Sequence, residues 1–205
     1  MFYTIKGECS AEITEKKSKF ICNVFHVESV QEAEEKLNIV RKKYHDARHN
    51  CYVYKVVEED AFKASDDGEP SGTAGVPMLN IVNGRNLSNI LVVVTRYFGG
   101  ILLGTGGLVR AYSLATTTAL DDSNIIKQEM GLEASFNVEY KELEEVKYHL
   151  KNRNIVISKQ EYLENVKVFV EGREEDILKL QNEKLSERVE LKDFVVLKKK
   201  YIEIE

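Results

Sequence analysis

The sequence predicts an α+β protein of two domains, for three reasons. The chain has 205 residues, enough for one large domain or two small ones at the usual size of about 100–150 residues. Nine of its twelve glycines lie between Gly68 and Gly107, whereas only Gly172 follows Leu132. The second part of the chain alternates strand and helix patterns in the order β-α-β-β-α-β. We therefore expect a first domain over residues 1–125 and a ferredoxin-like second domain over residues 131–205.

Composition excludes several classes of protein. The chain is 43% hydrophobic and 31% charged, which supplies apolar material for packed cores and excludes a disordered tail. A formal net charge of −5 excludes a bulk polycation that coats nucleic acid, but not a local basic patch. No apolar run reaches the ~18 residues of a membrane span, no export signal opens the sequence, and the three cysteines are widely spaced. We expect a cytoplasmic protein with reduced thiols, no membrane contact, no metal and no cofactor.

Hydrophobic periodicity predicts the elements of the first half. Ser29 and Glu32 have the spacing of a capping box, so a helix should begin there. The unbroken apolar run from Ile90 to Val94, followed by Thr95, is typical of a strand buried on both faces. In chain order, the expected elements are a strand over 20–26, a helix over 29–44, a strand over 50–57, a helix over 76–83, a strand over 90–95 and a helix over 108–120.

The second half has a regular pattern of short elements. Phe136, Val138 and Tyr140 alternate with polar residues as a half-buried strand does. Two later stretches place their leucines, isoleucine and valine at helical spacing. The expected elements are a strand over 134–140, a helix over 142–152, strands over 155–161 and 166–170, a helix over 174–185 and strand material over 188–204. The domain boundary is expected within residues 124–131.

Two loops of the first half contain the residues that could carry chemistry. One covers residues 66–75, and the other covers residues 95–110 and runs from the buried strand directly into a helix. Exposed N–H groups at a helix start, on a glycine-rich backbone, favour an anion, and Arg96 and Arg110 could flank it as phosphate ligands. The Walker and dinucleotide-binding patterns do not fit, because the loop has no lysine and Val109 stands where a third glycine is required. The alternative is that the glycines serve only tight turning and close helix–sheet packing.

Other side chains admit weaker interpretations. A divalent cation could bind three acidic residues, although a solvated acidic loop fits their spacing better: Asp66, Asp67 and Glu69. Ser71 lies outside the nucleophile-elbow pattern, so we expect its hydroxyl to cap the following turn. His49 and Cys51 share one strand face and could form a Cys–His pair, although a buried cysteine beside a hydrogen-bonded histidine fits strand geometry better.

Arginine beside two aromatic residues, in Arg96-Tyr97-Phe98, is a pattern that can hold phosphate and stack bases. The alternative is that Tyr97 or Phe98 anchors the loop in the core. We expect at most one of the two rings to be free to stack.

Around these loops the sequence resembles the IMPACT/YigZ family over about residues 18–120. The resemblance lies in five stretches: Lys17–Phe20, Ala47–Tyr52, Asp66–Gly75, Val94–Gly100 and Gly104–Tyr112. It implies a first domain with the fold shared by a small-subunit ribosomal protein domain, a domain of elongation factor G and the GHMP kinases. It implies a ferredoxin-like second domain similar to the last domain of elongation factor G. It also implies kinship to regulators of translation, which is the role of eukaryotic members of the family.

The leading hypothesis is a translation-associated binding protein that contacts RNA, the ribosome or a translation factor. Its contact residues would be Arg96, Tyr97, Gly99, Gly100, Gly104, Thr105, Gly106, Gly107 and Arg110. Accessory residues would be His49, Asp67, Glu69, Ser71 and Thr73. The alternative is an enzyme that holds a small phosphorylated or nucleotide substrate at the same loop, with His49, Asp67 and Glu69 as acid–base groups or metal ligands. No residue is assigned as catalytic, because no nucleophile, kinase lysine or metal cluster is visible.

Overall fold

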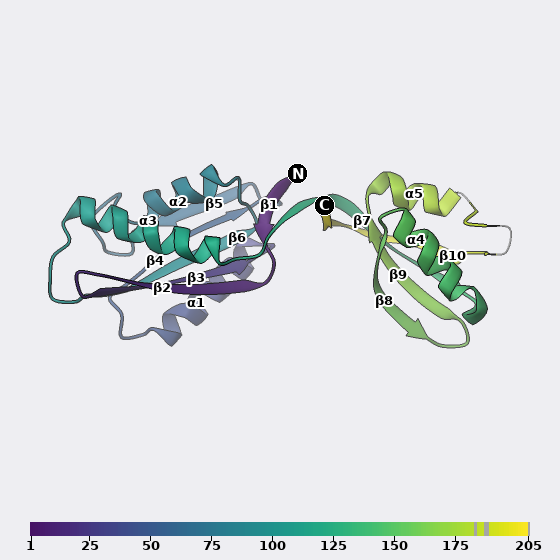
Figure 1. The fold of residues 1–205 in the computed structure, drawn as a ribbon, viewed down its shortest axis with the longest axis horizontal. Coiled ribbons are helices and arrows are strands. Elements are labelled where there is room, and N and C mark those ends of the chain that lie inside the picture. The colour runs from purple at the N-terminus through teal and green to yellow at the C-terminus, as the bar shows by residue number, and fades with distance from the viewer. Residues whose placement is uncertain (183, 187–188, 205) are drawn as a thin grey trace. The chain divides into compact units, whose positions relative to one another are not determined.

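The computed structural model describes residues 1–182, 184–186 and 189–204. The chain forms two compact units, one over Phe2–Lys127 and one from Gln128 onward together with Met1 (Figure 1). Both units combine helices and strands, so the protein is of mixed α+β type. None of the helices in the described ranges is long and apolar enough to cross a membrane.

An antiparallel sheet forms the centre of the first unit, with the strand order β2-β3-β6-β4-β5. Its strands are β2 (Glu8–Glu15), β3 (Ser18–His26), β6 (Ile90–Tyr97), β4 (His49–Val56) and β5 (Ala61–Ser65). β6 is the central strand, and all its residues from Ile90 to Arg96 are buried. The prediction of a strand buried on both faces is therefore confirmed, although its neighbours run antiparallel to it.

One face of this sheet is covered by α1 (Val30–Lys43), which packs its buried Ala33, Leu37 and Val40 there. The Ser29 side chain accepts a hydrogen bond from the Glu32 N–H at 3.1 Å, as a capping box requires. The Glu32 carboxylate returns to the N–H of Glu28, at 2.9 Å, rather than to that of Ser29. The helix predicted from this spacing is confirmed, and the capping box is displaced by one residue.

The opposite face is covered by α2 (Gly75–Gly84) and α3 (Thr105–Asp121). Alternate residues of β3 face these helices, among them Phe20, whose ring meets that of Tyr112 edge-on at 5.2 Å. Both predicted helices are present, and α3 begins three residues earlier than expected. This face contains the loops that the sequence analysis singled out.

Three strands of the first unit were not predicted: β1 (Phe2–Ile5), β2 and β5. β2 and β5 are the edge strands of the sheet, and along β2 exposed residues alternate with half-buried ones. Because an edge strand buries little apolar surface, its sequence gives a weak strand signal. β5 lies between the strand expected over 50–57 and the helix expected over 76–83, where no element was predicted.

The second unit has the element order β7 (Ile125–Val138), η1 (Tyr140–Glu142), α4 (Leu143–Asn152), β8 (Val156–Tyr162), β9 (Val166–Gly172), α5 (Glu174–Asn182) and β10 (Lys192–Ile204). β9 lies between β7 and β8, and β10 pairs with β7. Leu143, Val146 and Leu150 of α4 pack with alternate residues of β7 and β9 in the core. β7 begins at Ile125, inside the stretch expected to be the domain boundary and earlier than the predicted residue 134. α5 ends at Asn182, before the predicted residue 185. The predicted start of the last strand, at 188, lies outside the described residues.

Candidate functional site

Strand register places three side chains in one row across the sheet, near the end of β6. Arg96 pairs with Phe20 of β3 on one side and with His49 of β4 on the other. Arg96 is only 7% exposed, and its guanidinium group lies over the rings of Phe20 and Phe98, 5.5 and 5.6 Å from their centroids. The predicted contact arginine is therefore largely enclosed by aromatic rings.

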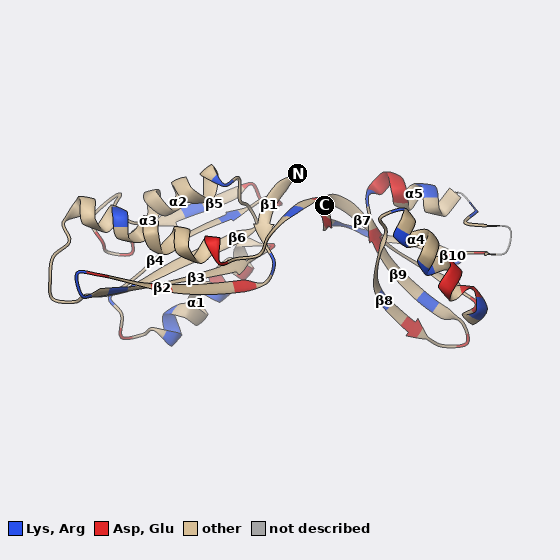
Figure 2. Ribbon diagram, viewed as in Figure 1, with Lys and Arg blue, Asp and Glu red and all other residues tan. Residues whose placement is uncertain are grey.

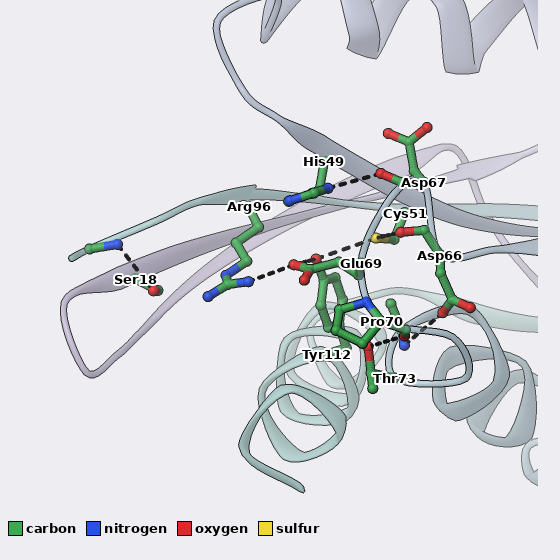
Figure 3. A network of polar contacts seen from close by, with 12 residues as sticks. Ser18, His49, Cys51, Asp66, Asp67, Glu69, Pro70, Thr73, Arg96 and Tyr112 are labelled. Carbon is green, nitrogen blue, oxygen red and sulfur yellow. Dashed lines mark hydrogen bonds and ion pairs between the residues drawn. The ribbon is translucent and has the colours of Figure 1, made fainter. Parts of the chain in front are cut away.

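A buried ion pair joins Arg96 to the first of the two loops. Its Nη1 donates to Glu69 Oε1 at 2.7 Å, and the two side chains are 8% and 3% exposed (Figure 3). The same carboxylate oxygen accepts the hydroxyl of Tyr112, from α3, at 2.8 Å. Because a buried charge is costly unless it is paired, this carboxylate holds β6, α3 and the loop in one arrangement.

Cys51 of β4 extends the same network. Its thiol lies 2.9 Å from the Asp66 carbonyl and 3.3 Å from the Tyr112 hydroxyl. Burial raises the pKa of Cys51 to about 12, and burial, Cys51 and Glu69 raise the pKa of Tyr112. Since the thiolate is the reactive form of cysteine, the Cys51 thiol is chemically inert at neutral pH. The interpretation as a buried cysteine beside a hydrogen-bonded histidine is confirmed, because His49 Nδ1 donates to the Asp67 carbonyl at 2.9 Å.

Asp66 caps the turn that leads into α2. Its carboxylate accepts the backbone N–H groups of Gly72, Ala74 and Gly75 at 2.8, 2.9 and 2.8 Å. Burial raises the pKa of this carboxyl group, but the three backbone hydrogen bonds outweigh it and the net shift is downward. The N-terminus of α2 is thus satisfied by the protein's own carboxylate.

Asp67 is also engaged by the protein. It accepts the Asn50 N–H at 2.7 Å and the Arg41 guanidinium at 3.2 Å. The solvated acidic loop expected from the sequence is therefore wrong: Asp66 and Asp67 hold backbone groups, and Glu69 is buried. Among the described residues, no group of three histidine, cysteine or acidic side chains could hold a metal ion.

Ser71 and Thr73 lie in the turn between these acidic residues and α2. Thr73 is buried and its hydroxyl donates to the Pro70 carbonyl at 2.6 Å, whereas Ser71 is exposed. Thr73, rather than Ser71 as expected, therefore supplies the hydroxyl that closes this turn.

Glycines in the second loop allow the backbone to pack closely. A Cβ atom on Gly99 would lie 2.0 Å from the backbone of Lys17, and the Gly99 N–H donates to the buried Ser18 hydroxyl at 3.1 Å. Gly104, with φ of +71°, turns the chain into α3, where a side chain would be strained. Leu103 is 8% exposed and anchors the loop between these turns. The loop is therefore fixed at Gly99 and Leu103.

Between and beyond these anchors the second loop is exposed. Phe98, Ile101 and Leu102 are 53%, 43% and 82% exposed, and no side chain caps the N-terminus of α3 at Gly104. A pocket of about 190 Å³ is lined by two cations, Arg110 from the first turns of α3 and Lys16 from the β2–β3 turn, by one carboxylate, Glu15, and by Leu103 and apolar residues of α3. The loop thus presents apolar side chains beside helix N–H groups and two cations, a combination that suits an anionic group with a flat or apolar portion.

The structure divides the predicted contact residues into two groups. Exposed residues at the start of α3 include Gly104, Thr105, Gly106 and Arg110, whereas Arg96 is buried. Gly99 and Gly107 are half-buried, and Gly100 is exposed with φ of +82°. The Tyr97 hydroxyl donates to Asp46 at 2.7 Å, so Phe98 is the freer of the two rings.

Sequence reasoning missed four residues of this region: Ser18, Phe20, Phe98 as the exposed ring, and Tyr112. A signal existed for Ser18, Phe20 and Tyr112, because each lies in one of the family-like stretches. No local pattern indicated which ring of Tyr97 and Phe98 faces solvent, because that depends on where β6 ends.

The chain is similar in sequence and in structure to known proteins. The family described as the Impact N-terminal domain matches residues 16–120. The relative "IMPACT family member YvyE" of Bacillus subtilis is 39% identical over 176 residues, 84% of this chain and 81% of that protein. An "IMPACT family member" of Haemophilus influenzae is 35% identical over 84% of this chain and 85% of that protein. A crystal structure described as that of an hypothetical protein is 32% identical, with a TM-score of 0.62, and covers 93% of this chain and 95% of that one.

Proposed function

The chain belongs to the IMPACT family, and from that premise we propose that it is a translation-associated regulatory protein that contacts RNA or a ribosomal partner through the second loop. The proposed role in translation comes from the family, whose eukaryotic members regulate translation. The proposed contact surface comes from the exposed residues of the second loop. We also propose that the two units have the ribosomal-protein-type and ferredoxin-like folds that the resemblance implies.

One observation supports the contact surface most strongly: the loop exposes Phe98, Ile101 and Leu102 beside the uncapped start of α3. A monomeric domain gains nothing in stability from such exposure, and a rigidly anchored loop is a suitable place for binding. Arg110 and Lys16 add positive charge at the same place. We propose that the exposed residues of the second loop make the contact. Arg96 is buried and contributes indirectly, because its ion pair with Glu69 joins the end of β6 to the first loop.

The enzyme alternative has less support from the geometry. Its proposed acid–base groups were His49, Asp67 and Glu69, and each is held by hydrogen bonds to other parts of the protein. A small phosphorylated ligand at the pocket beside Arg110 is the second candidate, because that pocket combines two cations, Lys16 and Arg110, with apolar walls and only one carboxylate, that of Glu15. A thermal-shift screen of nucleotides and phosphorylated metabolites, with and without magnesium, tests it, since a ligand of the folded state must raise the melting temperature.

Ribosome co-sedimentation at low and moderate salt tests the main proposal. The informative variant is Phe98→Ala/Arg110→Ala, because both residues are exposed and their loss should leave the fold intact. Substituting Arg96 would confuse the result, since it would leave Glu69 buried and unpaired.

A matched control is Tyr148→Ala/Lys151→Ala, which removes an exposed aromatic residue and an exposed cation from α4 of the second unit. We expect salt-sensitive sedimentation of the wild type and the control, and a loss of at least tenfold in the loop variant. Equal sedimentation of all three proteins would show that the loop is not the contact surface.

A further inference from the structure

A second group of cations lies near the loop, at the end of α1. Residues 41–48 contain four arginines and lysines and one histidine in eight positions, in a protein of net charge −5. Lys42, Lys43 and Arg48 are exposed. Cations in the last turn of a helix stabilise its dipole, which explains Lys42 and Lys43 in part. It does not explain Arg48, which lies beyond the helix, in the connection to β4.

Two hydrogen bonds tie this segment to the two loops, one to each. Asp46 accepts the hydroxyl of Tyr97, the residue before Phe98, at 2.7 Å. Arg41 donates to Asp67, on the first of the two loops, at 3.2 Å. On the other side, the backbone of Lys17 packs against Gly99. The end of α1, the β2–β3 turn and the start of α3 therefore meet at one end of the first unit, where Figure 2 shows blue segments on all three.

We define the basic rim as the exposed cations of these three segments. Its members are Lys16, Lys17, Lys42, Lys43, Arg48 and Arg110. Within the described residues, none of the six forms an ion pair. Of the acidic residues at this end, Asp66 accepts backbone N–H groups, Asp67 pairs with Arg41 and Glu69 pairs with Arg96. Two further carboxylates, Glu15 beside Lys16 and Arg110 and the exposed Asp46, form no ion pair within the described residues and offset part of the positive charge. The rim therefore keeps a local excess of positive charge on an acidic protein.

We propose that the basic rim binds the phosphate backbone of single-stranded RNA while Phe98 stacks on a base. This inference rests on the proposed function and assigns its partner and a second contact element, the end of α1. Lysine and arginine on separate segments suit a chain of phosphates, which needs positive charge along a path rather than one bidentate pocket. Phe98, 53% exposed at the same end of the unit, adds a stacking face for a base.

Fluorescence anisotropy with a labelled 20-nucleotide oligouridylate, measured on the full chain across a range of salt, tests the proposal. The rim variant is Lys42→Ala/Lys43→Ala/Arg48→Ala, and its control is Lys151→Ala/Lys179→Ala/Lys199→Ala, which removes the same charge from exposed positions of the second unit. We expect the rim variant to bind about tenfold more weakly at 0.1 M salt and to lower the salt slope by about 2, because each single-strand phosphate contact contributes about 0.7 to it. The control should match the wild type.

Two further measurements separate this inference from the function on which it rests. If the rim variant keeps the wild-type affinity and slope while Phe98→Ala/Arg110→Ala abolishes ribosome sedimentation, the function stands and the role of the α1 end is wrong. If poly-glutamate displaces the RNA as well as unlabelled oligouridylate does, or if ribosomes bind and oligouridylate does not, single-stranded RNA is not the partner and the inference is overturned. If neither RNA nor ribosomes bind at any salt, both proposals are wrong.

Discussion

The buried ion pair between Arg96 and Glu69 predicts that a substitution of Glu69 restores most of the stability that is lost on substituting Arg96. Arg96→Met keeps most of the side-chain volume between Phe20 and Phe98 but removes the positive charge. It leaves the Glu69 carboxylate, 3% exposed, buried without a positive charge beside it, while the Tyr112 hydroxyl still donates to it. Glu69→Gln then removes the negative charge and keeps an oxygen that can accept from Tyr112.

The magnitudes follow from burial. Removing one partner of a buried ion pair costs about 3–5 kcal/mol, because the other charge stays buried without compensation. Replacing both partners by neutral groups of similar volume is often close to neutral. We therefore expect Arg96→Met to cost about 3–5 kcal/mol and the double variant to cost at least about 2 kcal/mol less than that.

Hydrogen–deuterium exchange in the full chain is the suitable assay. The protein has no tryptophan, and its two units need not unfold together, so a single spectroscopic transition would not isolate the first unit. Peptides from residues 90–97 report on β6 directly. At about 1.4 kcal/mol per factor of ten, Arg96→Met should speed their exchange more than 100-fold, and the double variant should recover most of that factor. A double variant as unstable as Arg96→Met would refute the reasoning, as would a cost below about 1 kcal/mol for Arg96→Met.

Three other predictions concern the same unit. Asp66→Asn should destabilise the first unit by about 1–2 kcal/mol at pH 7, because an amide nitrogen cannot accept the Gly72 N–H. Since the pKa of Asp66 is lowered on folding, its contribution is present above an unfolded pKa of about 3.9 and is lost as pH falls through the folded value. In urea unfolding at pH 2, followed through the hydrogen exchange of peptides from residues 75–84 so that the first unit is observed alone, the difference should be smaller, and an equal difference would count against the cap. In native protein at pH 8, iodoacetamide should fail to modify Cys51, whose pKa is raised to about 12 by burial, and mass spectrometry should detect its adduct only after denaturation; modification of native Cys51 at the rate of a free cysteine would contradict the assigned burial. Gly99→Ala should cost about 3 kcal/mol or more because its Cβ would lie 2.0 Å from the backbone of Lys17, whereas a Cβ on Gly84 would meet nothing within 4 Å. Hydrogen exchange of the peptides from residues 90–97 should therefore speed up in Gly99→Ala and change little in Gly84→Ala, and equal exchange in the two variants would contradict the packing at Gly99.

Much of the fold could be predicted because burial leaves a pattern in the sequence. β6 was evident from its unbroken apolar run, and α1 from its cap and periodicity. The edge strands β2 and β5 were not, because all their residues are exposed or only half-buried, which leaves a weak apolar pattern in the sequence. The early start of β7 was hidden by polar residues and by Gly131, which the sequence suggested as a boundary.

The sequence indicated which two loops form the site, but not which side chains contact one another within it. Arg96 and Glu69 are 27 residues apart, and they meet because β4 pairs with β6 in a register that no local pattern encodes. The same register places Cys51 under the first loop and turns the Tyr97 hydroxyl toward Asp46. The acidic residues could not be assigned to backbone hydrogen bonds from sequence, because the same Asp-Asp-Gly-Glu pattern also suits a solvated loop.

Ultraviolet cross-linking of the protein to the ribosome tests the central claim, that the second loop is the contact surface. Trypsin cleaves after Arg96 and Arg110, so one peptide, residues 97–110, contains the whole exposed loop and the start of α3. The account predicts that this peptide carries cross-linked nucleotide and that it still does so in Tyr148→Ala/Lys151→Ala. In Phe98→Ala/Arg110→Ala trypsin no longer cleaves at position 110, so the corresponding peptide is residues 97–127, and the account predicts that this longer peptide carries no cross-link. Cross-links confined to peptides of the second unit, or unchanged in the loop variant, would contradict it.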